Sequence, residues 1–247
     1  MIAAHRQPAY RVRMEWGPTG AAAVAATGGV AVVVDVLSFT TTLSVAMDAG
    51  ITVYPFRWKD ERAEAYAAER DAVLARGRSA RTGVSLSPVT VRASSGVERL
   101  VLPSPNGSAI SFGLADTGAT VVGASLRNAT AVARSLAASD GPIAVVAAGE
   151  RWPDGSLRPA VEDLWGAGAV LAALVDLGAT GLSPEATMAA AAYRDVSGRI
   201  ADELDACASG RELVDIGFAD DVEIAAEVDA SDAVPVLDGD AFVGSIG

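Results

Sequence analysis

The sequence predicts an α/β protein in which helices cover both faces of a central sheet, a three-layer α/β/α arrangement with mostly parallel or mixed strands. Short β-branched runs alternate with Ala-rich segments of helical length. The run 31–34 is apolar at every position, as expected for a strand covered on both faces. With 51% hydrophobic residues, the 247-residue chain can bury a large core. Together these observations favour the α/β class.

The whole chain, residues 1–247, is expected to form one domain. We find no linker, internal repeat or low-complexity tract that would mark a boundary. A two-lobed arrangement within this span, with no boundary assigned, is the alternative.

The first half of the chain is expected to begin with an edge strand at 10–16, where apolar and charged residues alternate. The strand at 31–34 then leads into a helix that reaches about Ala49, and residues 51–56 form the next strand. These three elements predict an initial βαβ unit. Other expected elements are a short helix at 21–26, a long charged helix at 59–76, a strand at 98–102 and a helix at 109–115.

The second half continues the alternation of strands and helices. A polar turn is expected at 217–221 and a final strand pair at 233–237 and 241–243. The elements expected before that turn are strands at 120–123 and 143–147, a helix from about 125 to 138, a loop at 152–159, and helices at 164–177, 184–193, 198–208 and 211–214.

The composition excludes several classes of function. A net charge of -12 would repel nucleic acid and anionic membrane surfaces. A single cysteine, Cys207, excludes internal disulfides, and a single histidine, His5, excludes histidine triads. A general acid or base must therefore be a carboxylate, Lys, Tyr or water. Without a signal peptide or an apolar stretch of about 18 residues, the protein is expected to be cytoplasmic and to have no membrane span.

Asp35 stands where the buried strand 31–34 ends, and hydroxyl residues follow it. Open α/β sheets bind ligands at this edge, and the free N–H groups of the next helix attract an anion. A phosphate would suit this position if a divalent cation on Asp35 offset the repulsion between the two. The alternative is that Asp35 or Ser38 only caps the helix. The hydroxyl residues are Ser38, Thr40, Thr41 and Thr42.

Polar clusters also follow later strands. Gly107 permits close backbone approach to a ligand, and Asn106 and Ser108 can donate to an oxyanion, although Pro-Asn-Gly is also an ordinary turn. Glu162 and Asp163 begin an apolar helix, where the helix dipole alone would favour them. They are also well placed as metal ligands, or as the acid or base. The remaining members of these clusters are Asn128 and Glu150.

The region 77–96 is rich in Gly, Ser, Arg and Thr and has no clear period. It is interpreted either as a mobile loop or as an excursion near the site. Arg78, Arg81 and Arg92 fall in it. A local basic cluster can steer an anion in so acidic a protein, and ordinary surface solvation is the alternative for each arginine.

Taken in order, these motifs resemble the 2-phosphosulfolactate phosphatase (ComB) family over nearly the whole chain. The resemblance implies a magnesium-dependent acid phosphatase with an α/β/α fold. Such an enzyme releases phosphate from 2-phosphosulfolactate on the coenzyme M route, and accepts related 2-hydroxycarboxylic acid phosphates. The motifs lie at 35–42, 105–108, 125–129, 148–150, 162–163 with 167–168, and 220–222 followed by 234–235.

The sequence departs from the family pattern at several positions. Ser38 stands where the opening motif often has Arg, which removes a donor for a sulfonate, carboxylate or phosphate. A Gly-Glu-Arg element appears only as 81–83, and an Asn-Ser-Pro element as 86–88. The cysteine usual in the C-terminal motif is absent from 222–226. These departures concern the substrate more than the fold.

The resulting hypothesis is Mg²⁺-dependent hydrolysis of a small anionic phosphorylated metabolite. Mg²⁺ would be held by Asp35 with Glu162 or Asp163, and Asp35 is either a ligand only or also the nucleophile. A non-catalytic small-anion-binding protein and a different metal-dependent hydrolase are the alternatives. An acidic α/β enzyme of this size can also pair into a homodimer. The catalytic candidates are Asp35, Glu150 and Glu162, and the phosphate-binding candidates are Ser38, Thr40, Thr41, Thr42, Asn106, Gly107, Ser108 and Asn128.

Overall fold

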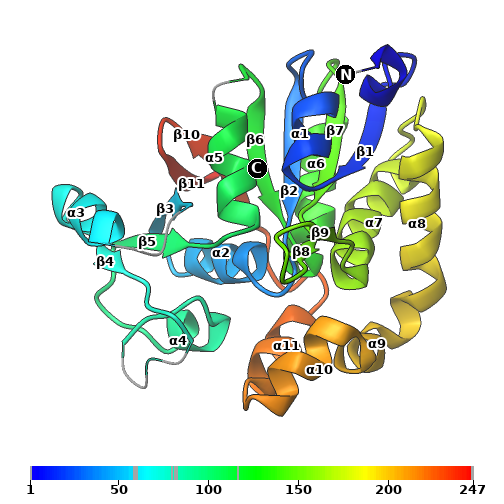
Figure 1. Cartoon of the computed structure of the whole chain (residues 1–247). Helices are drawn as coiled ribbons and strands as arrows, with labels where there is room; N and C mark the ends of the chain where they lie inside the picture. Colours follow the sequence, from blue (N-terminus) through cyan, green and yellow to red (C-terminus); the bar gives the residue numbers. More distant parts are fainter. Residues whose placement is uncertain (1, 58–60, 79, 81–82, 116, 246–247) are drawn as a thin grey trace.

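A large mixed sheet forms the centre of the protein (Figure 1). The computed structural model describes residues 2–57, 61–78, 80, 83–115 and 117–245. Within these residues the strand order of the main sheet is β1-β7-β2-β6-β10-β11-β3-β5-β4, and β8 and β9 form a separate hairpin. The strands are β1 (Val12–Trp16), β2 (Val30–Val34), β3 (Thr52–Phe56), β4 (Val73–Leu74), β5 (Arg99–Pro103), β6 (Thr120–Ala124), β7 (Ile143–Ala147), β8 (Glu150–Arg151), β9 (Leu157–Arg158), β10 (Val234–Asp238) and β11 (Ala241–Ser245).

Helices connect most of these strands. The α-helices are α1 (Gly17–Val24), α2 (Phe39–Asp48), α3 (Glu61–Glu69), α4 (Pro88–Arg92), α5 (Gly107–Ala115), α6 (Ala129–Ala137), α7 (Val161–Asp176), α8 (Pro184–Val196), α9 (Ile200–Ala206), α10 (Ala208–Asp215) and α11 (Ala219–Ala225). Three short 3₁₀ helices in the described chain are η1 (Ala3–Arg6), η2 (Leu126–Asn128) and η3 (Ser197–Arg199).

The sheet consists of two parallel groups joined by an antiparallel hairpin. Strands β1, β7, β2 and β6 pair in parallel, as do β3, β5 and β4. The hairpin β10–β11 lies between the groups and pairs antiparallel with β6 on one side and β3 on the other. The two groups therefore run in opposite directions along the sheet. Figure 1 shows that β5 nevertheless lies crosswise to β2, as the twist of a wide sheet allows.

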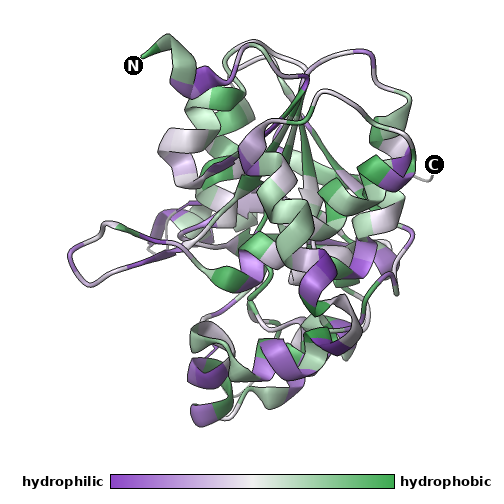
Figure 2. Ribbon diagram, turned by 90° about the vertical axis from the view of Figure 1, so that its right-hand side faces the viewer, coloured by the Kyte–Doolittle hydropathy of each residue, from purple (hydrophilic) through white to green (hydrophobic). Residues whose placement is uncertain are grey.

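Both faces of the parallel group are buried, as the apolar run of β2 predicts. Val32 and Val34 join a core with α6, α7 and α8, while Ala31 and Val33 face a second core with α1, α2 and α5. Figure 2 shows the hydrophobic strands between the helices. The predicted three-layer α/β/α class with a mostly parallel, mixed sheet is confirmed. The helices α9, α10 and α11 lie below the sheet, at the end where β8 and β9 are found (Figure 1).

The predicted βαβ unit is wrong. Strands β2 and β3 follow each other through α2, but β6, β10 and β11 lie between them in the sheet and they run in opposite directions. The C-terminal hairpin occupies the place next to β3, and sequence order alone does not reveal that insertion. The predicted strand pair near the C-terminus is confirmed as this hairpin.

Several element predictions need correction. The helix expected at 198–208 ends at Ala206 as α9, and α10 begins at Ala208 and includes the segment 211–214. The helix expected to reach Arg76 ends at Glu69, because Asp71 adopts a left-handed backbone and β4 then pairs with β5. Its first expected residues, 59 and 60, lie outside the described residues. The expected loop 152–159 contains β9, and the polar turn at 217–221 is already the start of α11. Arg13 of the edge strand is buried, since its guanidinium donates to carbonyl oxygens of Tyr10 and Val24.

Candidate functional site

The carboxylate of Asp35 joins the first residues of two helices. The main-chain N–H of Phe39, in α2, donates to Oδ1 at 3.2 Å, and that of Gly107, in α5, donates to Oδ2 at 2.7 Å. Asp35 is only 4% exposed. Two helix N-termini therefore stabilise its negative charge at the carboxyl end of β2. The predicted position at the sheet edge is confirmed, and the capping interpretation is also correct for this side chain.

The threonine hydroxyl groups after Asp35 form hydrogen bonds with the backbone. Thr40, Thr41 and Thr42 donate to the carbonyl oxygens of Asp35, Val36 and Leu86, at 2.8, 2.7 and 2.6 Å. All three are buried. Because a hydroxyl has one proton, these donors are occupied in the folded chain. This geometry favours the alternative that the threonines begin the helix, and gives no support to the predicted phosphate contacts through their hydroxyl protons.

Gly107 lets α5 approach Asp35 closely. A Cβ at this position would lie 2.5 Å from Cδ1 of Phe39 and 2.8 Å from Oδ2 of Asp35, so no larger residue fits. Ser104, which the sequence did not single out, donates to the same Asp35 oxygen at 3.4 Å. The predicted close backbone approach at Gly107 is thus real, but its partner in this structure is Asp35. Ser108, by contrast, donates its hydroxyl to the carbonyl of Leu102 at 2.8 Å.

Glu150 extends the cluster from the end of β7. Its Oε2 accepts a 2.8 Å hydrogen bond from the amide of Asn106, which ties the turn before α5 to the hairpin β8–β9. The two residues line a cavity of about 260 Å³ together with Trp16 and Thr19. Burial, followed by the charge of Asp35, raises the pKa of Glu150 to about 7. Glu150 can therefore exchange a proton near neutral pH, a property that the sequence does not reveal.

Glu162 and Asp163 begin α7 on the same side of the sheet. Asp163 accepts main-chain N–H groups from Val36 at 2.7 Å and Gly149 at 2.8 Å, so it holds the ends of β2 and β7 together. Both carboxylates are buried. The thiol of Cys207 donates to Glu162 at 3.6 Å, and burial raises its pKa to about 12, so it remains protonated. The predicted interpretation of Cys207 as buried packing rather than nucleophile agrees with this environment.

These carboxylates act on one another electrostatically. Burial raises the pKa of Asp35, hydrogen bonds from Gly107 and Phe39 oppose this, and the charge of Glu162 adds to it. Burial raises the pKa of Asp163 still further, and the charges of Asp35 and Glu162 contribute. A cation beside them would stabilise the ionised forms of Asp35 and Asp163.

The donor chemistry suits Mg²⁺, although the described residues hold no group of three or more His, Cys, Asp or Glu side chains arranged as a preformed metal site. Every candidate ligand in the cluster is a carboxylate oxygen, which hard cations prefer. Mg²⁺ usually keeps several waters and needs only one or two protein carboxylates. Asp35 and Glu162 can meet that requirement. Within the described residues Glu162 accepts only the 3.6 Å contact from the Cys207 thiol, and Oδ1 of Asp35, like each oxygen of Asp163, accepts one main-chain N–H group and keeps a second lone pair.

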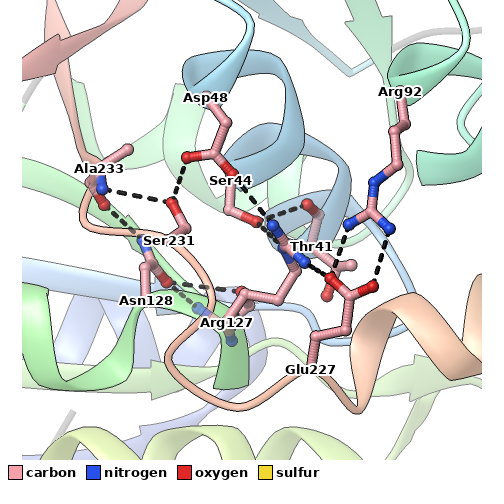
Figure 3. Close-up of polar contacts among 10 residues, drawn as sticks. Thr41, Ser44, Asp48, Arg92, Arg127, Asn128, Glu227, Ser231 and Ala233 are labelled. Atoms are coloured by element: carbon pink, nitrogen blue, oxygen red, sulfur yellow. Dashed lines mark hydrogen bonds and ion pairs between the residues drawn. The ribbon is translucent and has the colours of Figure 1, made fainter.

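Asn128 lies in a different network (Figure 3). Its Oδ1 accepts the N–H of Ser125, and its amide donates to the carbonyl of Ala233 at 3.0 Å. Next to it, the buried guanidinium of Arg127 binds Ser44 at 3.0 Å and Asp48 at 2.9 Å. The structure therefore places Asn128 in helix capping and gives no support to its predicted contact with phosphate. This polar network joins α2 to the C-terminal segment.

Comparison with known proteins identifies the family to which this arrangement belongs. The family model of 2-phosphosulpholactate phosphatase matches residues 19–240. A probable 2-phosphosulfolactate phosphatase of Deinococcus radiodurans is 33% identical over 215 residues, which cover 84% of this chain and 87% of the relative. The chain belongs to the 2-phosphosulfolactate phosphatase family. The matched region includes the complete carboxylate cluster.

The charges of two arginines act on the carboxylate cluster. The guanidinium of Arg78 donates to the hydroxyl of Ser38 and, at 3.1 Å, to Oδ2 of Asp221. The turn at residue 38 thus has an arginine contact although it carries serine. Arg158 donates to Ser209 at 2.9 Å, and its charge lowers the pKa of Glu150. The sequence singled out Arg78 as one of the arginines that can steer an anion, with surface solvation as the alternative, whereas the unpredicted hairpin β8–β9 concealed Arg158.

The region 77–96, interpreted from the sequence as a loop or an excursion, contains the short helix α4, and its other arginines differ in their environment. Arg92 forms two hydrogen bonds with Glu227, at 2.7 and 2.6 Å, so it is a surface ion pair rather than part of the site. Arg81 lies outside the described residues. In the described part of the chain, none of the helices is long and apolar enough to span a membrane.

Proposed function

We propose that this protein is a Mg²⁺-dependent phosphatase that hydrolyses 2-phosphosulfolactate, or a related 2-hydroxycarboxylic acid phosphate, to the hydroxy acid and phosphate. One observation carries the proposal: in a chain of this family, Asp35 lies at two helix N-termini and within electrostatic reach of Glu150 and Glu162. Buried carboxylates with perturbed pKa values are typical of functional sites.

The residues of the chain suggest separate roles for the carboxylates. Asp35 and Glu162 would hold Mg²⁺, which would neutralise phosphate charge and so allow the anion to approach the carboxylates. Asp35 is fixed by Phe39 and Gly107, so little reorganisation is needed when substrate binds. With a pKa near 7, Glu150 is suited to pass a proton to or from water or the leaving hydroxyl oxygen. Asp163 would support the site by fixing the ends of β2 and β7.

The test is phosphate release from 2-phosphosulfolactate by the purified protein, with added Mg²⁺ and after removal of divalent cations by EDTA. We expect activity that requires Mg²⁺ and that falls by about 10²-fold or more in Asp35→Asn, because Asp35 would act on charge in the transition state. The exposed Asp202 supplies a control, and Asp202→Asn should keep wild-type activity.

Two outcomes would reject parts of this proposal. Retention of most activity in Asp35→Asn would exclude Asp35 as the central carboxylate. Tight binding of sulfolactate without turnover of any phosphorylated 2-hydroxy acid would instead indicate the non-catalytic anion-binding protein that the sequence left open.

A further inference from the structure

The side chain of Arg78, in the loop after β4, contacts two other segments of the chain. Its Nε donates to Asp221 of α11 at 3.1 Å, and its Nη2 donates to Ser38, the residue before α2. The Asp221 side chain is 1% exposed, whereas that of Arg78 is 19% exposed. The pair therefore has a buried anchor and a guanidinium that solvent can reach.

Several elements fix the position of this guanidinium. The second carboxylate oxygen of Asp221 accepts a hydrogen bond from Ser87, the residue before α4. Ser87 is itself buried, and the ring of Phe218 lies 5.9 Å from the guanidinium carbon of Arg78. An arginine held through Nε by a buried carboxylate keeps its planar donor groups in a defined orientation.

Most of the donor capacity of Arg78 is still available. A guanidinium has about five N–H donors, and only Asp221 and Ser38 accept from Arg78 among the described residues. Arg78 also lines an open cavity of about 1230 Å³, together with Leu86 and Pro103. Free donors at the wall of a cavity can bind an oxyanion that enters it.

The guanidinium is electrostatically close to the carboxylate cluster. Its charge is among the effects that lower the pKa of Asp35 against the larger effect of burial. Arg78 therefore lies between the proposed Mg²⁺ and phosphate site on one side and the cavity on the other. Since the chain carries a net charge of -12, binding of an anion in this cavity requires such a local cation.

We infer that Arg78 determines substrate specificity by binding a second anionic group of the substrate, a carboxylate or a sulfonate, beside the phosphate. The inference rests on the proposed function. The charge of the Arg78 guanidinium is already partly neutralised by Asp221. It can therefore bind a singly charged oxyanion, mainly through the geometry of its hydrogen bonds. The doubly charged phosphate is better matched to the carboxylate cluster when Mg²⁺ is bound there. Asp221 acts as a positioning residue for Arg78.

Four phosphate monoesters separate the groups that Arg78 could recognise. 2-Phosphosulfolactate has a carboxylate and a sulfonate, 2-phospholactate has the carboxylate, 2-phosphooxypropane-1-sulfonate has the sulfonate, and isopropyl phosphate has neither. In Arg78→Gln we expect KM to rise about tenfold or more for esters that carry the recognised group, with little change in kcat/KM for isopropyl phosphate. A higher KM for 2-phospholactate identifies the recognised group as the carboxylate, and a higher KM for 2-phosphooxypropane-1-sulfonate identifies it as the sulfonate.

Conservative and control variants distinguish recognition from folding. Arg78→Lys keeps the charge but not the planar donor pair, so it should recover only part of the loss. Asp221→Asn should raise KM for the same esters and change kcat little. Arg134 of α6 is exposed and does not line this cavity, so Arg134→Gln is the control and should behave like wild type. Thermal unfolding of each variant verifies that it is folded.

An equal loss of kcat/KM for all four esters in folded Arg78→Gln would refute the inference, as would wild-type KM values for all of them. If the wild-type protein hydrolyses none of the four, the proposed function fails and calorimetric binding of sulfolactate decides the role of Arg78. Binding by wild type that weakens about tenfold in Arg78→Gln would support anion recognition, and equal or absent binding would overturn it.

Discussion

Replacement of Gly107 by alanine tests whether the close contact between α5 and Asp35 maintains the site. The added Cβ would lie 2.5 Å from Cδ1 of Phe39, 2.8 Å from Oδ2 of Asp35 and 2.9 Å from Cβ of Asp35. Phe39 and Asp35 are both buried, so neither can move freely into solvent. The helix must shift, and the 2.7 Å hydrogen bond from the Gly107 N–H to Asp35 must lengthen.

The expected loss of stability follows from these contacts. Overpacking of a buried site costs about 1–3 kcal/mol. Replacing glycine in a helix returns about 0.5–1 kcal/mol. Gly107→Ala should therefore lower the free energy of unfolding by about 1 kcal/mol, and by at most about 2.5 kcal/mol. Displacement of Asp35 by a fraction of an ångström to 1 Å should also reduce kcat by about 10–100-fold.

Urea unfolding and steady-state phosphate release measure the two effects, and Gly113 provides the control in the same helix. Gly113 is exposed, and a Cβ there meets no other atom within 4 Å. Gly113→Ala should stabilise the protein by about 0.5–1 kcal/mol and leave kcat unchanged. Gly107→Ala with the stability of Gly113→Ala and wild-type kcat would refute the argument.

Two other predictions concern buried charge. Arg127→Met should lower the unfolding free energy by about 2–3 kcal/mol, because partly buried Asp48 and Glu227 lose their common cation. Urea unfolding measures this loss, and the exposed control Arg134→Met should change the unfolding free energy much less. Equal losses in the two variants would contradict the prediction. Glu150→Gln removes a carboxyl whose pKa rises from 4.5 to about 7 on folding. The folded state binds that proton more tightly, so wild type should lose up to about 3 kcal/mol relative to Glu150→Gln between pH 4.5 and 7 in EDTA. Urea unfolding at several pH values measures the difference, and a pH-independent difference would exclude this titration.

The local sequence pattern correctly predicted elements whose own residues determine their burial. The apolar run of β2 specified a strand buried on both faces, and Asp35 followed at its carboxyl end as expected. The long helix expected up to Arg76 was wrong because good helix formers continue past Glu69, where pairing of β4 with β5 overrides local propensity. The order of the strands in the sheet could not be predicted from local sequence patterns either, since the hairpin β10–β11, which lies between β2 and β3, comes from the end of the chain.

The site shows the same division between local and distant information. Glu150 and Glu162 follow or face strand ends, and this position was enough to group them with Asp35. For Arg78 the sequence left two alternatives, anion steering and surface solvation, because its position depends on Asp221, which lies more than one hundred residues later and was expected in a turn. The three threonines after Asp35 were correctly placed at the helix start, but their hydroxyl protons are donated to carbonyl oxygens.

The charges of the site explain why the fold holds Asp35 between two helix N-termini. Burial and the neighbouring Glu162 both favour the neutral carboxyl, whereas the N–H groups of Gly107 and Phe39 and the charge of Arg78 favour the ionised form. A bound cation would also favour the ionised form of Asp35, and it would lower the pKa of Glu150. Cation affinity should therefore rise with pH as Glu150 ionises near pH 7, because the cation then no longer competes with a bound proton.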